Sequence, residues 1–150
     1  MADKPVNYFQ ITPEIATSGQ PNETQIHEIA EEGYDVVVNL AMHDSDNALP
    51  NEGSLVASLG MNYVNIPVPF EEPESTHLKQ FVGIMQAFEG SRVWVHCAVN
   101  ARVSAFMYQY LTLVKKLPED QATTPLLTKW RPKMDAAWRE FLQIKAEEID

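Results

Sequence analysis

Cysteine is almost absent from this chain of 150 residues, in which Cys97 stands alone. A single cysteine excludes a disulfide within the chain and a zinc site built from several cysteines. Long apolar runs are also missing, because no stretch approaches the roughly 20 residues that a membrane-spanning helix needs. The amino-terminal residues lack the basic start and apolar core of a signal peptide. We therefore expect a cytoplasmic protein with no membrane partner.

Basic residues are also few in this chain. The chain has 11 Lys and Arg residues against 21 Asp and Glu residues, which gives a net charge of −10. No cluster of basic residues could displace the counterions of a polyanion, so we expect no nucleic-acid partner. An anionic substrate would need a local binding site. The length and the hydrophobic content of 45% are typical of one compact domain over residues 1–150.

Hydrophobic spacing predicts helices that alternate with strands. The predicted strands are a pair within residues 8–18 and single strands at 34–40, 61–68 and 91–96. The predicted helices cover 22–32, 54–59, 76–88 and 101–116, followed by two helices split around Pro132. This order indicates an α/β fold with a mainly parallel central sheet flanked by helices. Ligands of such folds bind beyond the carboxyl ends of the strands.

One segment joins the last predicted strand to the next helix: His96-Cys97-Ala98-Val99-Asn100-Ala101-Arg102. A strand that turns tightly into a helix directs several backbone N–H groups into the turn. The partial positive charge of the helix N-terminus adds to their field, so the turn can bind an oxyanion. We expect residues 98–102 to form this phosphate-binding loop.

Cys97 is the predicted nucleophile of this loop. The field that attracts an oxyanion also stabilises a thiolate, which is the reactive form of cysteine. Arg102, in the first turn of the helix, can hold two oxygens of a phosphate or sulfate with its planar guanidinium group. His96 is expected below the sulfur, where it could donate a hydrogen bond to the loop and favour the thiolate.

With these residues the sequence resembles the cysteine-dependent phosphatases of the tyrosine and dual-specificity superfamily. The most similar members are the small bacterial branch, which includes domains fused to metallo-β-lactamase-like hydrolases. Four segments occur in the order and at the spacing of that family: residues 18–21, 33–40, 63–68 and the loop that begins at His96. The resemblance implies the cysteine-phosphatase fold.

The resemblance also implies a phosphomonoesterase that needs no metal or other cofactor. Cys97 would attack phosphorus to form a phosphocysteine, Arg102 would bind the phosphoryl oxygens, and water would hydrolyse the intermediate. The implied substrate is a phosphorylated small molecule or a phosphoprotein. The oligomeric state does not follow from it.

The loop departs from the wider superfamily at three points. Four residues separate Cys97 from Arg102, whereas five are usual there. Asn100 stands where Gly is common, and Asn tolerates left-handed backbone angles better than most residues. Val103 stands where Ser or Thr is common, with Ser104 one position later. Rhodanese-type sulfurtransferases also use a Cys-x4-Arg loop, so sulfur transfer is an alternative function. A degenerate module that binds phosphate without turnover is another.

The general acid is not marked by the sequence. The dual-specificity phosphatases carry an Asp after the strand that corresponds to residues 61–68, and the aligned place here is residues 69–70, Pro-Phe. Glu72 is our first candidate. Glu71, Asp44 and Asp46 are the alternatives.

Overall fold

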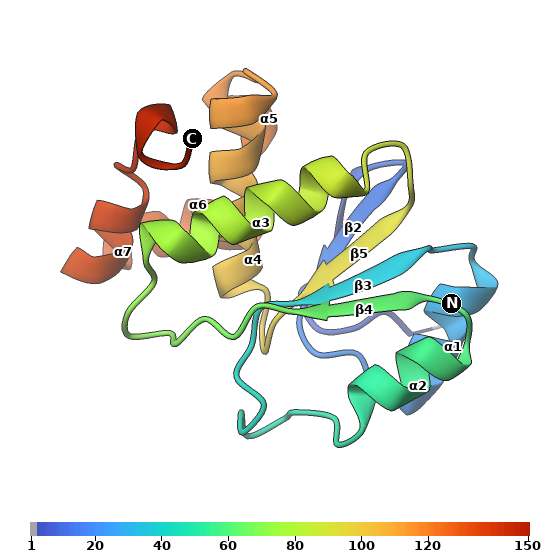
Figure 1. Ribbon diagram of the computed structural model, residues 1–150. Coiled ribbons are helices and arrows are strands. Elements are labelled where there is room, and N and C mark those ends of the chain that lie inside the picture. Colours follow the sequence, from blue (N-terminus) through green and yellow to red (C-terminus); the bar gives the residue numbers. More distant parts are fainter. Residues whose placement is uncertain (1–2) are drawn as a thin grey trace.

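The computed structural model describes residues 3–150 and has a five-stranded sheet at its centre, in the order β1-β2-β5-β3-β4 (Figure 1). The strands are β1 (Phe9–Thr12), β2 (Ile15–Ser18), β3 (Val36–Asn39), β4 (Asn62–Asn65) and β5 (Val93–His96). β1 runs antiparallel to β2, and all other neighbours are parallel. The predicted α/β fold with a mainly parallel sheet is confirmed.

Helices cover both faces of the sheet, so its central strands β3 and β5 are buried along their whole length and consist mainly of hydrophobic residues. One face packs against α1 (Glu23–Glu31) and α2 (Glu52–Ser58). The other packs against α3 (Ser75–Ala87), α4 (Ala101–Gln109) and the carboxyl-terminal helices, as Figure 1 shows. Those later helices are α5 (Glu119–Ala122), α6 (Pro125–Trp130) and α7 (Ala136–Phe141), with 3-10 turns at Arg131–Lys133 and Ala146–Glu148.

β5 is the middle strand of the sheet and is buried along its whole length. Its alternate residues serve the two faces, as the period of a strand requires. Trp94 belongs to the core under α1 and α2, whereas Val93 and Val95 belong to the core under α3 and α4. The residues that follow His96 therefore begin at the carboxyl end of the central strand, between the ends of β2 and β3.

The helix predicted over residues 101–116 is not one regular helix. α4 ends at Gln109 and continues as a π-helical turn, Tyr110–Val114. The Thr112 hydroxyl donates to the carbonyl of Tyr108 at 2.9 Å, and the Lys115 N–H reaches the carbonyl of Tyr110, five residues back. Hydroxyls that bond to a preceding turn loosen regular α-helical geometry.

Other elements also differ from the prediction. β4 ends at Asn65, before the end of the predicted strand, although the N–H groups of Ile66 and Val68 still donate to the carbonyls of Asn39 and Leu40. α2 begins at Glu52, two residues before the predicted start. The short helix α5, after Pro118, was not predicted. No helix within residues 3–150 is both long and apolar enough to cross a membrane.

Candidate active site

Cys97 is the first residue after β5, and its side chain is fully buried. Its backbone N–H donates to the carbonyl of Ser18 at the end of β2, over 3.3 Å. On the other side of β5, the Leu40 N–H donates to the carbonyl of His96 at 2.8 Å. The cysteine is thus fixed between the ends of two parallel strands, the place where α/β folds bind ligands.

The loop turns into α4 at Asn100. This residue has the left-handed backbone angles φ 74° and ψ 11°, which few side chains other than Gly and Asn adopt readily. Its amide Nδ2 donates to the carbonyl of Asn7 at 2.7 Å and to the hydroxyl of Thr17 at 3.3 Å. The amide therefore ties the turn to the amino-terminal segment, a function that a glycine could not provide.

Three other segments hold the outer side of the loop. The carbonyl of Ala98 accepts hydrogen bonds from the Gln20 N–H and from the Asn47 amide, each at 3.0 Å. The Asn7 amide donates to the carbonyl of Val99 at 2.8 Å. Because these outward carbonyls are occupied, the peptide groups of the loop are fixed in orientation before any ligand binds.

Arg102 lies in the first turn of α4 and is only 6% exposed. Its Nη1 donates to the carbonyl of Val68 at 2.8 Å, and the ring of Phe70 lies 5.7 Å from the guanidinium carbon. Its Nε atom is buried and has no hydrogen-bond partner among the described residues. A buried donor without an acceptor costs about 1–3 kcal/mol, and more when the group is charged, so this N–H fits a bound anion.

His96 is fully buried below the loop and bridges two acceptors. Its Nδ1 lies 3.2 Å from the carbonyl of Cys97, and its Nε2 lies 2.5 Å from the carboxylate of Glu52. Glu52 is 4% exposed and also accepts a 2.7 Å hydrogen bond from the Gln20 amide. Since a backbone carbonyl only accepts, Nδ1 is the donor of the first contact, and the pair with Glu52 fixes the orientation of the ring.

Glu52 was missed by the sequence analysis. It opens a helix after a polar loop, where an acidic residue is common for reasons of the helix dipole alone. Glu52 also affects Tyr63. Burial raises the pKa of the Tyr63 phenol to about 12, and the nearby Glu52 carboxylate adds to the shift.

The four candidate general acids lie on two loops that come near the site, and all four are exposed. Glu71 and Glu72 follow Phe70, and the Glu72 N–H closes a turn onto the carbonyl of Pro69. Asp44 and Asp46 lie on the loop that also carries Asn47. The structure therefore brings Cys97, Arg102 and His96 together but leaves the acids in solvent. In the described part of the chain, no group of three or more His, Cys, Asp or Glu side chains could hold a metal ion.

No family model matches the sequence, and no curated protein matches it significantly. Among solved structures, the "Putative phosphatase (DUF442)" of Shewanella putrefaciens CN-32 has 35% sequence identity and a TM-score of 0.84. The match covers 93% of this chain and 90% of that one. The chain belongs to the cysteine-dependent phosphatase superfamily.

Two further cysteine phosphatases share the fold at lower identity. Tk-PTP has 23% identity and a TM-score of 0.74, with 94% of this chain and 97% of that one covered. TpbA of Pseudomonas aeruginosa has 14% identity and a TM-score of 0.71, with 96% and 88% covered. A second TpbA structure is a complex with phosphotyrosine. These two structures show that the chain shares the fold of this superfamily.

Proposed function

We propose that this protein hydrolyses phosphomonoesters through a phosphocysteine intermediate on Cys97. The observation that carries the proposal is Arg102: a buried guanidinium, one helical turn from a buried cysteine, with an N–H that meets no acceptor in the described residues. An oxyanion bound in the loop would supply that acceptor. It would also meet the partial positive charge at the N-terminus of α4.

In the proposed reaction, the thiolate of Cys97 attacks phosphorus opposite the leaving oxygen. A sulfur–phosphorus bond forms, the phosphorus–oxygen bond to the leaving group breaks, and the leaving oxygen takes up a proton. Water then attacks the phosphocysteine, which releases inorganic phosphate and restores the thiolate. Arg102 and the N–H groups of residues 98–102 would hold the phosphoryl oxygens in both steps.

His96 and Glu52 are positioning residues in this proposal. The His96 ring would hold the loop through the carbonyl of Cys97, and the Glu52 carboxylate would fix that ring in orientation. For the proton on the leaving oxygen, Glu72 is the proposed donor. The loop that carries it passes the site, because Phe70 lies against Arg102. Glu71, Asp44 and Asp46 are the alternative donors.

The proposed substrate is a phosphorylated small molecule or a phosphoprotein. Phosphotyrosine occupies one TpbA structure, and the PTPMT1 neighbour was solved with PI(5)P. Both ligands are phosphomonoesters, which is the chemical class that the loop of this chain suits.

Turnover of para-nitrophenyl phosphate, with a metal chelator present, tests the proposal. The Cys97→Ser variant should reduce phosphate release to background, because a hydroxyl is a far weaker nucleophile than a thiolate. Arg102→Lys should lower kcat/KM by about 100-fold, because an ammonium cannot bind two oxygens in the same geometry. Arg139→Lys makes the same exchange at an exposed site on α7 and is the matched control.

Activity that survives in Cys97→Ser would contradict the proposal. Sulfur transfer from thiosulfate to cyanide is assayed on the same preparations. Sulfur transfer without phosphate release would favour the sulfurtransferase. Phosphate binding without either activity would favour the binding module. Circular dichroism of each variant checks that it is folded.

A further inference from the structure

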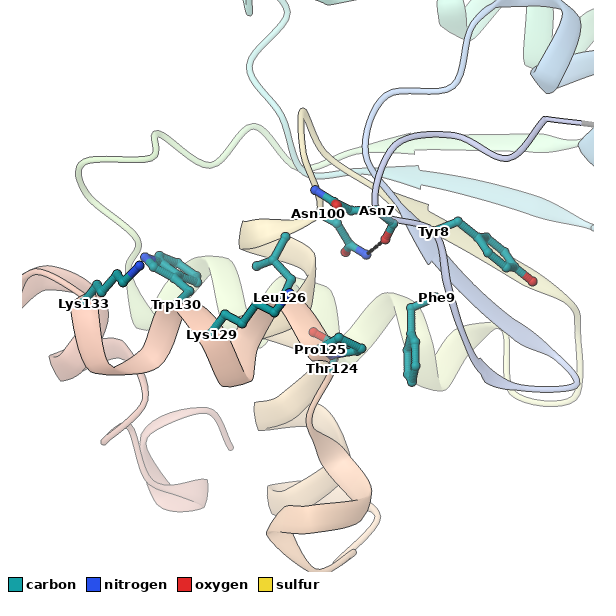
Figure 2. A pocket seen from close by; sticks show the side chains of 10 residues that line it. All are labelled: Asn7, Tyr8, Phe9, Asn100, Thr124, Pro125, Leu126, Lys129, Trp130 and Lys133. Carbon is teal, nitrogen blue, oxygen red and sulfur yellow. Dashed lines mark hydrogen bonds between the residues drawn. The ribbon is translucent and has the colours of Figure 1, made fainter.

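A pocket of about 460 Å³ lies beside the cysteine loop (Figure 2). The start of β1 forms one wall, α6 forms the other, and Asn100 of the loop lies between them. Figure 2 shows the Asn100 amide directed at Asn7 across the top of this space. Small-molecule sites in proteins range over about 300–1,000 Å³, so the pocket can hold a ligand of modest size.

The charge of the pocket is opposite to that of the molecule. The chain has 21 acidic residues, yet none lines this pocket, whereas Lys129 and Lys133 both do. Lysines spaced by four positions on a helical segment project from the same face. In the part of the chain that the structure describes, neither ammonium group is paired with a carboxylate. The pocket therefore carries positive charge and can attract an anion, although the molecule as a whole has a net charge of −10.

Between the lysines and β1, the walls are apolar and aromatic. Phe9 and Pro125 lie at one end of the pocket and Trp130 at the other, with Leu126 between them, as Figure 2 shows. Flat apolar walls beside a few charged groups suit a ligand that combines a hydrophobic or aromatic part with a negative group.

The aromatic wall leads to the proposed phosphate site. The ring of Trp130 stacks on Phe70 at 5.8 Å, and Phe70 lies 5.7 Å from the guanidinium carbon of Arg102. Asn100 belongs both to the cysteine loop and to the pocket lining. A phosphomonoester held in the loop could thus extend its carbon skeleton into the pocket.

We propose that this pocket binds the non-reacting part of the substrate, and that this part is an apolar or aromatic group with a second negative charge, held by Lys129 and Lys133. The inference rests on the proposed function, because it assigns the substrate class of that same loop. Lys129 and Lys133 are specificity residues in it and take no part in the bond changes.

The test compares kcat/KM for phenyl phosphate with kcat/KM for 3- and 4-carboxyphenyl phosphate. The carboxylate supplies the second charge on an aromatic skeleton. The wild type should prefer a carboxyphenyl ester, and the Lys129→Gln/Lys133→Gln variant should reduce that preference about tenfold at low ionic strength. The carboxylate also changes the leaving group, but this effect is the same in every variant and cancels in the comparison.

The control variant is Lys79→Gln/Lys145→Gln, which makes the same change in net charge outside the pocket. It should keep the wild-type preference, so that a loss in the first variant reports the pocket rather than the overall charge. If both variants keep the preference, or both lose it equally, the inference is overturned while the proposed function stands.

Failure of the proposed function gives a different result, namely no turnover of any of the three esters by the wild type. Calorimetric binding of the carboxyphenyl phosphates to Cys97→Ser then decides the inference alone. Binding that weakens in the Lys129→Gln/Lys133→Gln background but not in the control background supports it. Binding that is absent, or equal in both backgrounds, overturns it.

Discussion

The buried carboxylate of Glu52 lies 2.5 Å from Nε2 of His96, whose other ring nitrogen faces the carbonyl of Cys97. The His96 ring and the backbone of Cys97 lie between the Glu52 carboxylate and the sulfur, and both residues are fully buried. Charge interactions are stronger in such surroundings than at the surface. A change of one charge at position 52 should therefore alter the reactivity of the cysteine.

Glu52→Gln tests this effect because the amide keeps the size and a hydrogen-bond acceptor but removes the charge. We expect alkylation of Cys97 by iodoacetamide at neutral pH to slow about tenfold, because the His96 ring loses the charged partner that fixes it below the loop. Glu140→Gln, at an exposed site on α7, should leave the alkylation rate unchanged. A lower unfolding temperature with an unchanged alkylation rate would show that Glu52 is only structural.

The sequence was sufficient to select the residues of the loop, because they are contiguous and their chemistry is local. Cys97, Asn100 and Arg102 are within six positions of one another, and the left-handed angles at Asn100 agree with the expected tolerance of that residue type. Glu52 could not be selected, because its partner His96 lies 44 positions away. Nothing in a single sequence joins two such residues before the sheet brings them together.

At the scale of elements, the turn that leads from β2 into α1 packs directly against the cysteine loop. A Cβ atom at Gly19 would lie 2.6 Å from the carbonyl oxygen of Ala98 and 2.9 Å from the Cα of Val99. Real Cβ atoms essentially never approach backbone atoms so closely. The absence of a side chain at this position therefore allows the two segments to touch.

Gly19→Ala should destabilise the protein by about 1–3 kcal/mol in urea unfolding, and it should lower phosphatase activity further by displacing the loop. Gly83→Ala is the matched control. A Cβ atom there meets nothing within 4 Å, and the residue lies in the exposed part of α3. That change should stabilise the protein by about 0.5–1 kcal/mol, because Ala favours a helix interior. Equal effects at the two positions would contradict the packing argument.

Element type was predictable from hydrophobic spacing, whereas the irregular segments were not. The three central strands and the helices α1, α3 and α4 follow their patterns. β3 and β5 are buried along their whole length, α1 and α3 each bury one face, and all nine residues of α4 are buried. The π-helical turn contains a hydrogen bond from the Thr112 hydroxyl to the carbonyl of Tyr108, and the pattern of apolar residues carries no sign of such a bond. α5 is four residues long, too short for any period to appear.

At the scale of the whole molecule, burial raises the pKa of four tyrosines, Tyr8, Tyr63, Tyr108 and Tyr110. For Tyr63 the folded value is about 12. An unfolded tyrosine loses its proton near pH 10, so above that pH the folded state binds more protons than the unfolded state. The stability from this group is complete below about pH 10 and is lost as the pH rises toward 12.

Tyr63→Phe should therefore reduce the alkaline loss of stability. We expect the urea midpoint of the wild type to fall more steeply between about pH 10 and 12 than that of the variant. The hydrogen bond from Asn39 to the phenol is also lost, but that loss lowers the midpoint already at neutral pH and can be subtracted. The other three tyrosines should maintain a smaller slope in the variant. Parallel curves would contradict the assignment.

The hydrogen bonds that hold the cysteine loop join distant parts of the chain. Asn7 binds Val99 across 92 positions, and Asn47 binds Ala98 across 51. Contacts between residues so far apart in the chain form slowly during folding, because chain entropy is lost before the stabilising contacts are made. During refolding, we therefore expect the loop to reach its final conformation only after the sheet has formed and the amino-terminal segment has packed against it. Recovery of a reactive thiol would then mark the end of folding. In a partly folded chain, Cys97 would be present but would lack the reactivity that the finished loop gives it.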